Sequence, residues 1–519
     1  MASSTKLKKR ILFLALFATG LSGIVAEYCF ATLSTYFIGD SVKQWSIIIS
    51  LMLFSMGLGS RITKSFDGNV FKLFIYTEFT LSILVSFSAV TTYYLATQVE
   101  YISIYIYSMA ILTGMLIGME LPLAMRLNKD FQSLKLNVAN ILEKDYYGSL
   151  IGGLFFVFIG LPYLGLSHTP FILGFINLMV AILLLFIFKN KLKKKEKNTL
   201  YSAAGFIVVL LIIGTLLSSK IILYGEQTKY KDKIVFQEQS IYQKIVVTKW
   251  KKDYWLYLND NLQFSTFDEP LYHEVLVHPI MQILNKPRNI LILGGGDGCA
   301  ARELLKYPSI NKITLVDLDK KLTDLFVNEP ELTNINNNSL TNSKVQIINT
   351  DGFKYVSETQ YFFDLIIIDL PDPRNVELAR LYSKEFYELC RLKLIPNGGL
   401  ITQAGSPYYT PYAFKCIQQT MNQANFSVLP IHNQILSMGE WGWILGTKAP
   451  LSKDEMINRL GNFDESVIST KWLNSDSMSL ITSFGKGFYS KTKLDSLETN
   501  QISNPVLYHY YNKGNWDIY

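Results

Sequence analysis

Long apolar runs dominate the first 224 residues of the chain. Each run approaches the length of about 20 residues that an α-helix needs to cross a bilayer. They begin near Ile11, Trp45, Phe71, Ile102, Tyr147, Thr169 and Ser202. The first run follows LKKR, but it is long, contains Glu27 and lacks a clear small-residue cleavage site, which indicates a retained helix and not a signal peptide. Residues 1–224 are therefore predicted to form a multi-pass transmembrane domain of about seven α-helical spans.

The pattern changes after Ile222, where apolar runs shorten to strand length and charged and turn-forming residues return between them. Residues 225–285 contain KIVFQEQS, IYQKIVVTKW and YWLYLND, with a turn at 259–261. Their alternation predicts a small antiparallel β-subdomain. The next segment, QFSTFDEPLYHEVLVHPIM, resembles a loop that leads into a linking helix. Residues 286–519 are predicted to form a third unit, with a C-terminal extension of unassigned function after Pro450.

Strands and helices alternate from Asn289 onward. NILIL is predicted to be a buried parallel strand, GGGDG a tight turn, CAARELLKY a helix and KITLVDLD the next strand. This order predicts a doubly wound, Rossmann-like α/β sheet of the class I methyltransferase type. Ligands of such sheets bind beyond the carboxyl ends of the strands, where glycine lets the backbone approach them. Gly294 and Gly296 lie at that edge and are expected to line a nucleoside site.

Each predicted strand delivers a carboxylate to the same edge. These acidic residues are Asp297, Asp317, Asp351, Asp369 and Asp372. Asp317 stands about 20 residues after the glycine turn, where an acid commonly holds a ribose. Asp297, inside the turn, would repel a pyrophosphate and attract a cation. The pattern therefore favours a nucleoside with a positively charged appendage over NAD or ATP.

The net charge of +7 does not indicate a nucleic-acid partner, because the basic residues gather beside the apolar runs. Lys6 to Arg10 precede the first run, and KNKLKKKEKN lies between the sixth and seventh. The positive-inside rule assigns both segments to the cytoplasm. Seven spans would then put the C-terminal units outside, in conflict with the cytoplasmic location expected below from the chemistry. The four cysteines are scattered without metal-ligand spacing, so we expect neither a structural metal nor a disulfide framework.

Three carboxylates interrupt the apolar runs: Glu27, Glu78 and Glu120. Ionisable groups are costly in a bilayer and by default suggest a function, here a site or path for a cation. The alternative is that they lie near span ends or pair with a neighbouring tyrosine or backbone group.

Several motifs together resemble the spermidine synthase family, the polyamine aminopropyltransferases. They are YQKI, LNDNLQFSTFDEPLYHE, ILILGGGDGCAARELLKYPSINKITLVDLD, TDGFKYV, FDLIIIDLPDP and GEWGWILGTK, between about Tyr242 and Lys448. DYYGSLIGG and the stretch from LPDPRN to RLYSKEFY are similar to the membrane-bound bacterial members. The resemblance implies transfer of an aminopropyl group from decarboxylated S-adenosylmethionine to a diamine, usually putrescine, giving spermidine and methylthioadenosine.

The resemblance also implies roles for individual residues. Asp369 matches the catalytic base that takes a proton from the attacking amine. Asp372 is implied to hold the attacking end of the acceptor, and Asp297 to hold the ammonium of the donor. His273 matches a polyamine-contacting position.

The remaining matches concern the donor. Gln243 is implied to contact the methylthioadenosine portion, Asp317 the ribose hydroxyls, and Asp351 with Gly352 the adenine. The family more often has glutamate at the position of Asp317, LDG in place of LND, and a proline near Val376. The last two departures lie around the acceptor gate, so acceptor choice stays open among putrescine, spermidine, cadaverine and agmatine.

The implied reaction needs neither metal nor redox cofactor, because a sulfonium is already a good leaving group. Its donor derives from an intracellular metabolite, so the catalytic unit is expected in the cytoplasm, attached to the cell membrane. The soluble relatives commonly form dimers or tetramers. Two other functions stay open: a class I methyltransferase, which would use the same sheet, and a polyamine transporter or sensor with a non-catalytic synthase-like domain.

Overall fold

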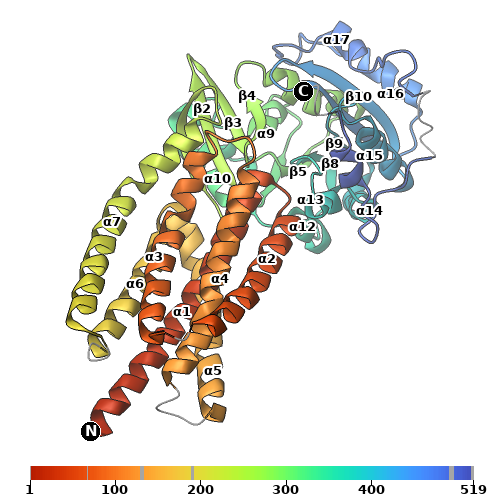
Figure 1. Cartoon of the computed structure of the whole chain (residues 1–519). Coiled ribbons are helices and arrows are strands. Elements are labelled where there is room, and N and C mark those ends of the chain that lie inside the picture. Colours follow the sequence, from red (N-terminus) through yellow and green to blue (C-terminus); the bar gives the residue numbers. More distant parts are fainter. Residues whose placement is uncertain (1, 67, 129–133, 189–191, 490–495, 516–519) are drawn as a thin grey trace. The chain divides into compact units, whose positions relative to one another are not determined.

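The structure is a computed structural model that describes residues 2–66, 68–128, 134–188, 192–489 and 496–515. The chain divides into two compact units, residues 1–233 and 234–519. The first unit is a bundle of long helices (Figure 1). They are α1 (Ala2–Ile38), α2 (Ser41–Ile62), α3 (Val70–Leu95), α4 (Ile102–Asn128), α5 (Leu134–Phe155), α6 (Gly165–Ile187) and α7 (Lys194–Gln227).

Six helical runs among the described residues are long and apolar enough to cross a membrane. The longest, Lys135–Ile187, has 53 residues and contains α5, a π-helical segment over Phe156–Leu164, and α6. A straight helix of that length would measure about 80 Å, far more than the bilayer core of about 30 Å. Gly165 stands at the junction with φ +61°, and both α5 and α6 pack against α1. The run therefore folds into two helices, and each has the length of one span.

The second unit begins with a four-stranded antiparallel sheet in the order β1-β2-β3-β4. Its strands are β1 (Lys233–Gln239), β2 (Lys244–Trp250), β3 (Asp253–Leu258) and β4 (Asn261–Ser265). Asn259 and Asp260 both have positive φ, as a two-residue type I′ hairpin turn requires. The sequence-based prediction of a loop from Gln263 was wrong for its first three residues: Gln263 to Ser265 belong to β4, which pairs with β3.

The main sheet has seven strands in the order β10-β11-β9-β8-β5-β6-β7. They are β5 (Asn289–Gly294), β6 (Lys312–Asp317), β7 (Val345–Asn349), β8 (Phe363–Asp369), β9 (Leu394–Gln403), β10 (Ser427–Ile435) and β11 (Gly439–Thr447). Strands β5 to β9 run parallel, and β10 and β11 form an antiparallel edge. The direction of winding reverses between β5 and β8, and ligands of doubly wound sheets bind at such a point. The predicted Rossmann-like sheet is thereby confirmed.

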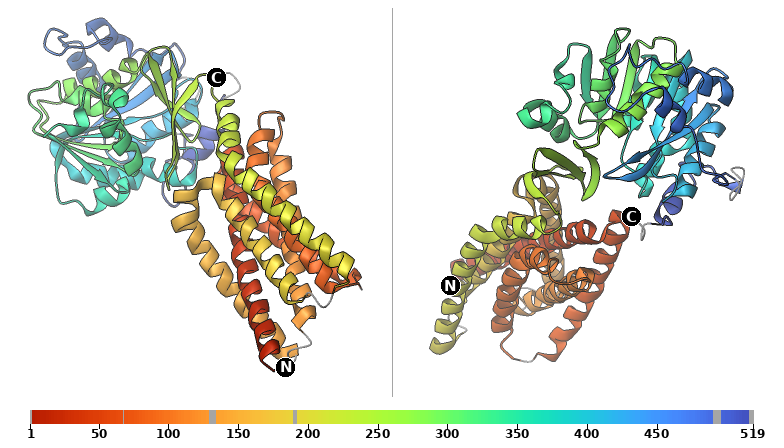
Figure 2. Two further views of the ribbon diagram at one scale, coloured as in Figure 1. Left: turned by 90° about the vertical axis from the view of Figure 1, so that its left-hand side faces the viewer. Right: turned by 90° about the horizontal axis from the view of Figure 1, so that it is seen from above.

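Helices cover both faces of this sheet (Figure 2). Ile290 and Ile292 face the core that includes α8 and α9, whereas Leu291 and Leu293 face the core that includes α14 and α15. Successive strand residues point to opposite faces, so the apolar run of β5 serves both cores. The helices of this unit are α8 (Pro270–Ile283), α9 (Cys299–Leu304), α10 (Lys320–Asn328), α11 (Pro330–Thr333), α12 (Gly352–Glu358), α13 (Val376–Ala379), α14 (Lys384–Lys393), α15 (Pro411–Gln423), α16 (Lys453–Leu460), α17 (Ser475–Leu480) and α18 (Leu507–Asn512).

Candidate active site

Asp369 ends β8 beside the glycine turn of β5. Its backbone pairs with Gly294, and its carboxylate accepts a hydrogen bond of 2.7 Å from the hydroxyl of Tyr272 on α8. Burial, reinforced by the charge of Asp297, raises the pKa of Asp369 to about 6. A carboxylate with this pKa is ionised at neutral pH and is a stronger base than an exposed one.

His273 lies next to these acids on α8, and its side chain is 2% exposed. Its Nδ1 contacts a carboxylate oxygen of Glu269 at 3.0 Å, and its Nε2 lies 3.8 Å from Oδ1 of Asp297. Burial alone would lower the pKa of His273, but the hydrogen bond to Glu269 and the charges of Asp297 and Glu269 raise it to about 9. The imidazole is therefore a buried cation at neutral pH, held between two carboxylates.

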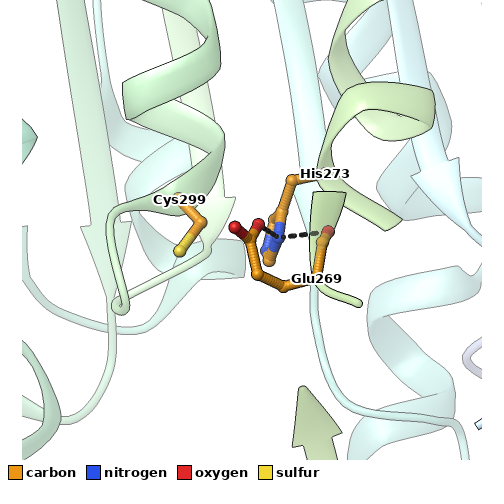
Figure 3. A group of neighbouring side chains, drawn as sticks. All are labelled: Glu269, His273 and Cys299. Atoms are coloured by element: carbon orange, nitrogen blue, oxygen red, sulfur yellow. Dashed lines mark hydrogen bonds and ion pairs between the residues drawn. The ribbon is translucent and has the colours of Figure 1, made fainter. Parts of the chain in front are cut away.

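Glu269, His273 and Cys299 stand close enough together to hold a metal ion by distance alone (Figure 3). The carboxylate of Glu269, however, also accepts hydrogen bonds of 2.9 and 2.8 Å from Arg302. Burial raises the pKa of the Cys299 thiol well above its usual value, which disfavours the thiolate that a metal binds. This group is better described as the support that orients His273 than as a metal site.

The glycine turn after β5 contacts the end of β6 through the carboxylate of Asp317. The amide of Gly296 donates to Oδ2 of Asp317 at 3.1 Å, and the amide of Asp319 donates to Oδ1 at 2.8 Å. A Cβ at Gly296 would lie 2.6 Å from Oδ2 of Asp317, so any larger residue there would have to displace this carboxylate. Burial raises the pKa of Asp317 to about 7. These contacts bring the predicted ribose acid and the predicted glycine together.

The other predicted donor residues lie around the same strand ends. The amide of Gln243 donates to Asp319 at 3.0 Å, a partner that the sequence did not suggest although Asp319 stands in the VDLD motif. Asp351 caps α12 by accepting from the amide of Lys354 at 2.9 Å, and it also contacts Arg380. One oxygen of Asp351 is thus occupied by the helix and the other by a guanidinium in this structure.

Asp372 is held by residues that sequence reasoning missed. Its Oδ2 accepts from the hydroxyl of Tyr511 at 2.6 Å, and its Oδ1 accepts from the amide of Gln403 at 3.3 Å. The same amide donates to the hydroxyl of Tyr382 at 2.6 Å. Tyr511 belongs to α18 in the C-terminal extension, to which the sequence assigned no function. The extension therefore supports a predicted acceptor-binding acid directly.

Tyr511→Phe should weaken acceptor binding more than it slows the reaction. Loss of the hydroxyl leaves Asp372 without its shortest hydrogen bond, a change of about 1–3 kcal/mol. We expect KM for the acceptor to rise about fivefold or more with little change in kcat. Tyr508→Phe, on the same helix, is the control, because Tyr508 lies against His509 and not against Asp372. Equal acceptor KM values for the two variants would contradict this role.

The pH profile of turnover should report the pKa of Asp369. If Asp369 is the base, as the resemblance implies, it must be ionised, so kcat/KM is expected to fall as the pH drops below about 6. The positive charge of His273 lowers that pKa, so His273→Gln should move the acidic limb to higher pH. Steady-state kinetics across pH 5 to 9 would check both effects. If the acidic limb of the His273→Gln profile stays at the pH of the wild type, the imidazolium does not act on Asp369.

Comparison with known proteins covers almost the whole chain. The model of the spermine/spermidine synthase domain matches residues 269–455. The polyamine aminopropyltransferase of Oceanobacillus iheyensis is 37% identical over 99% of this chain and 98% of its own length. Polyamine aminopropyltransferase 2 of Aquifex aeolicus is 40% identical over 99% of both. A crystal structure of spermidine synthase from Thermotoga maritima aligns with 50% of this chain and 87% of that chain, at 23% identity and a TM-score of 0.44. Because full-length relatives match it from end to end, the chain belongs to the polyamine aminopropyltransferases and is an enzyme of that family.

Proposed function

We propose that the enzyme transfers the aminopropyl group of decarboxylated S-adenosylmethionine to a diamine, with putrescine as the expected acceptor. The attacking ammonium group of the acceptor loses one proton to the carboxylate of Asp369, and the lone pair that this frees forms a bond to the carbon next to the sulfonium. The carbon–sulfur bond breaks, its electron pair stays on sulfur, and methylthioadenosine leaves. The positive charge of the sulfonium passes to the new secondary nitrogen, and spermidine results.

One observation supports this reaction above all others: Asp297 and Asp369 offer carboxylate oxygens within 4.8 Å of each other at the carboxyl ends of β5 and β8, and Asp372 follows β8 at the same edge. The donor carries a sulfonium and an ammonium, and the acceptor is a dication, so a carboxylate-rich edge concentrates and aligns both. Asp369 has the raised pKa that suits a general base. Asp297 would hold the ammonium of the donor, and Asp372 the attacking end of the acceptor.

The donor's nucleoside would lie along the glycine turn. Asp317 is proposed to hold the ribose hydroxyls, Gln243 the methylthioadenosine portion, and Asp351 with Gly352 the adenine. His273 is proposed to stand beside the polyamine. An S-adenosylmethionine methyltransferase is disfavoured at this edge, because its donor keeps a carboxylate that Asp297 would repel.

Turnover by the full-length protein tests the proposal. Decarboxylated S-adenosylmethionine would be offered with putrescine, spermidine, cadaverine or agmatine in turn, and the products separated by mass. Methylthioadenosine together with a new polyamine would support the reaction and identify the acceptor. Binding of polyamine without any product would overturn it in favour of a non-catalytic transporter or sensor.

We also propose that the helical unit spans a bilayer. Seven passes bring the start of α1 and the end of α7 to opposite ends of the bundle (Figure 1). The end that contains the start of α1 carries most of the basic residues: Arg10, Arg61, Lys64, Arg126, Lys193, Lys194, Lys195 and Lys197. The positive-inside rule would put this end in the cytoplasm and the catalytic unit on the other side. The intracellular origin of the donor argues for the reverse.

Labelling of single cysteines separates these two arguments. The native cysteines are buried, whereas Gln360 and Lys195 are exposed. If loop charge sets the orientation, a membrane-impermeant maleimide should label Gln360→Cys in intact cells and Lys195→Cys only after lysis. The reverse pattern would place catalysis in the cytoplasm, beside the source of its donor.

A further inference from the structure

Two buried carboxylates meet inside the helical bundle, outside the catalytic unit. Glu78 lies on α3 and is 0% exposed, and Glu120 lies on α4 and is 3% exposed. Their side chains are within hydrogen-bonding distance of each other. Apart from Glu120, neither oxygen of Glu78 has a hydrogen-bond partner among the described residues.

The basic groups on α3 and α4, the helices that carry the pair, are engaged elsewhere. Lys72, the only basic residue of α3, pairs with Glu196 at 3.3 Å. Arg126, the only basic residue of α4, donates to the backbone carbonyls of Thr63 and Phe66. Within the described part of the bundle, these helices therefore supply no counter-charge to the pair.

The groups that surround the pair add acceptors and negative charge. Asp145 on α5 acts on Glu120 through its charge, and Lys144 beside it pairs with Glu143. The helix α6 packs against α3, where Ser82 donates to the carbonyl of Gly174 at 2.8 Å.

Further polar and titratable groups lie on α3 and on the helices α6 and α1. On α6, His168 contacts Ser167. The side-chain oxygens of Asn177 on α6 and Ser86 on α3 are buried without a hydrogen-bond partner. Glu27 on α1 is a further buried carboxylate.

Two carboxylates in contact cannot both stay ionised in a low-dielectric interior, because like charges at this distance repel strongly. Each oxygen is an acceptor, so the contact needs a positive particle between the two groups. We propose that Glu78 and Glu120 form a monocation site, which holds a proton and exchanges it for a primary ammonium group. A polyamine carries this group at both ends. The ammonium ligand rests on the proposed function, whereas the proton does not.

Infrared spectroscopy of the full-length protein in lipid nanodiscs tests the site directly. The wild type should show a carboxylic-acid carbonyl band that shifts in D2O. Glu78→Gln and Glu120→Gln should each remove it, because the glutamine amide donates to the remaining carboxylate and lets it ionise. Glu143→Gln, at a partly exposed carboxylate on α5 that pairs with Lys144, is the matched control and should keep the band.

Titration of the same sample identifies the ligand. Loss of the band on addition of putrescine or spermidine, but not of Na⁺, would support exchange for an ammonium group. Loss only at high pH would support the proton as the ligand and overturn the ammonium exchange. Absence of an exchangeable carboxylic-acid band from the wild type, or its survival in both glutamine variants, would overturn the site. Turnover measured in parallel keeps the result separate from the proposed function, because neither glutamate lies in the catalytic unit.

Discussion

Asp369→Asn is expected to lower kcat by about 100- to 10,000-fold. An amide is not a base, so the acceptor nitrogen could not pass its proton to residue 369 as it attacks. The side chain would keep its size and could still accept from the hydroxyl of Tyr272. Donor binding should therefore change little. Single-turnover kinetics with decarboxylated S-adenosylmethionine, together with calorimetric binding of methylthioadenosine, would measure the two effects separately.

The control for this variant is Asp364→Asn, on the same strand at its opposite end. Asp364 accepts a hydrogen bond of 2.9 Å from the amide of Asn289, which an asparagine can also accept. Turnover by Asp364→Asn should stay near that of the wild type. If Asp369→Asn retained more than about a tenth of wild-type kcat, another group or solvent would be the base.

The sequence predicted which residues lie at the strand ends of the catalytic unit, but it did not predict the side chains that contact them. Apolar runs followed by glycine or aspartate place Gly294, Asp317 and Asp369 at one edge, because parallel strands share a direction. The contacts that orient these groups come from distant parts of the chain. Tyr272 stands 97 residues before Asp369, and Tyr511 stands 139 residues after Asp372. Local periodicity contains no information on such pairs, and only the packing of α8 and α18 brings them to the edge.

The pattern of apolar and polar residues also failed to predict short elements and buried charges. β4 has only five residues, too few for alternation to distinguish it from a loop. The charge of His273 depends on Glu269, one helical turn before it, and on Asp297 in another element. The spacing of Glu269 and His273 was visible in the sequence and could have suggested their pairing. The approach of Asp297 to His273 could not be predicted without knowing how the strands of the sheet are arranged.

Gly294→Ala is expected to destabilise the protein and reduce turnover together. Gly294 has φ +84°, and a Cβ there would lie 2.0 Å from the carbonyl oxygen of Asp369. A strained backbone of this kind costs about 1–3 kcal/mol, and the clash must push β5 and β8 apart at their ends. Because a displacement of about 1 Å at a reacting group can cost about 100-fold in rate, we expect kcat to fall by at least about tenfold. Thermal unfolding and steady-state turnover would measure both consequences.

Gly39→Ala is the control that separates backbone strain from the steric clash of the added Cβ. Gly39 has nearly the same φ, +85°, but nothing lies within 4 Å of its Cβ position. This variant should show the conformational cost alone, with turnover of the folded protein unchanged. If Gly294→Ala matched it in both stability and kcat, the close approach of β5 to Asp369 would not be what positions the base. A selective loss of kcat in Gly294→Ala would instead show that the first glycine of the turn serves catalysis by fixing where the Asp369 carboxylate stands.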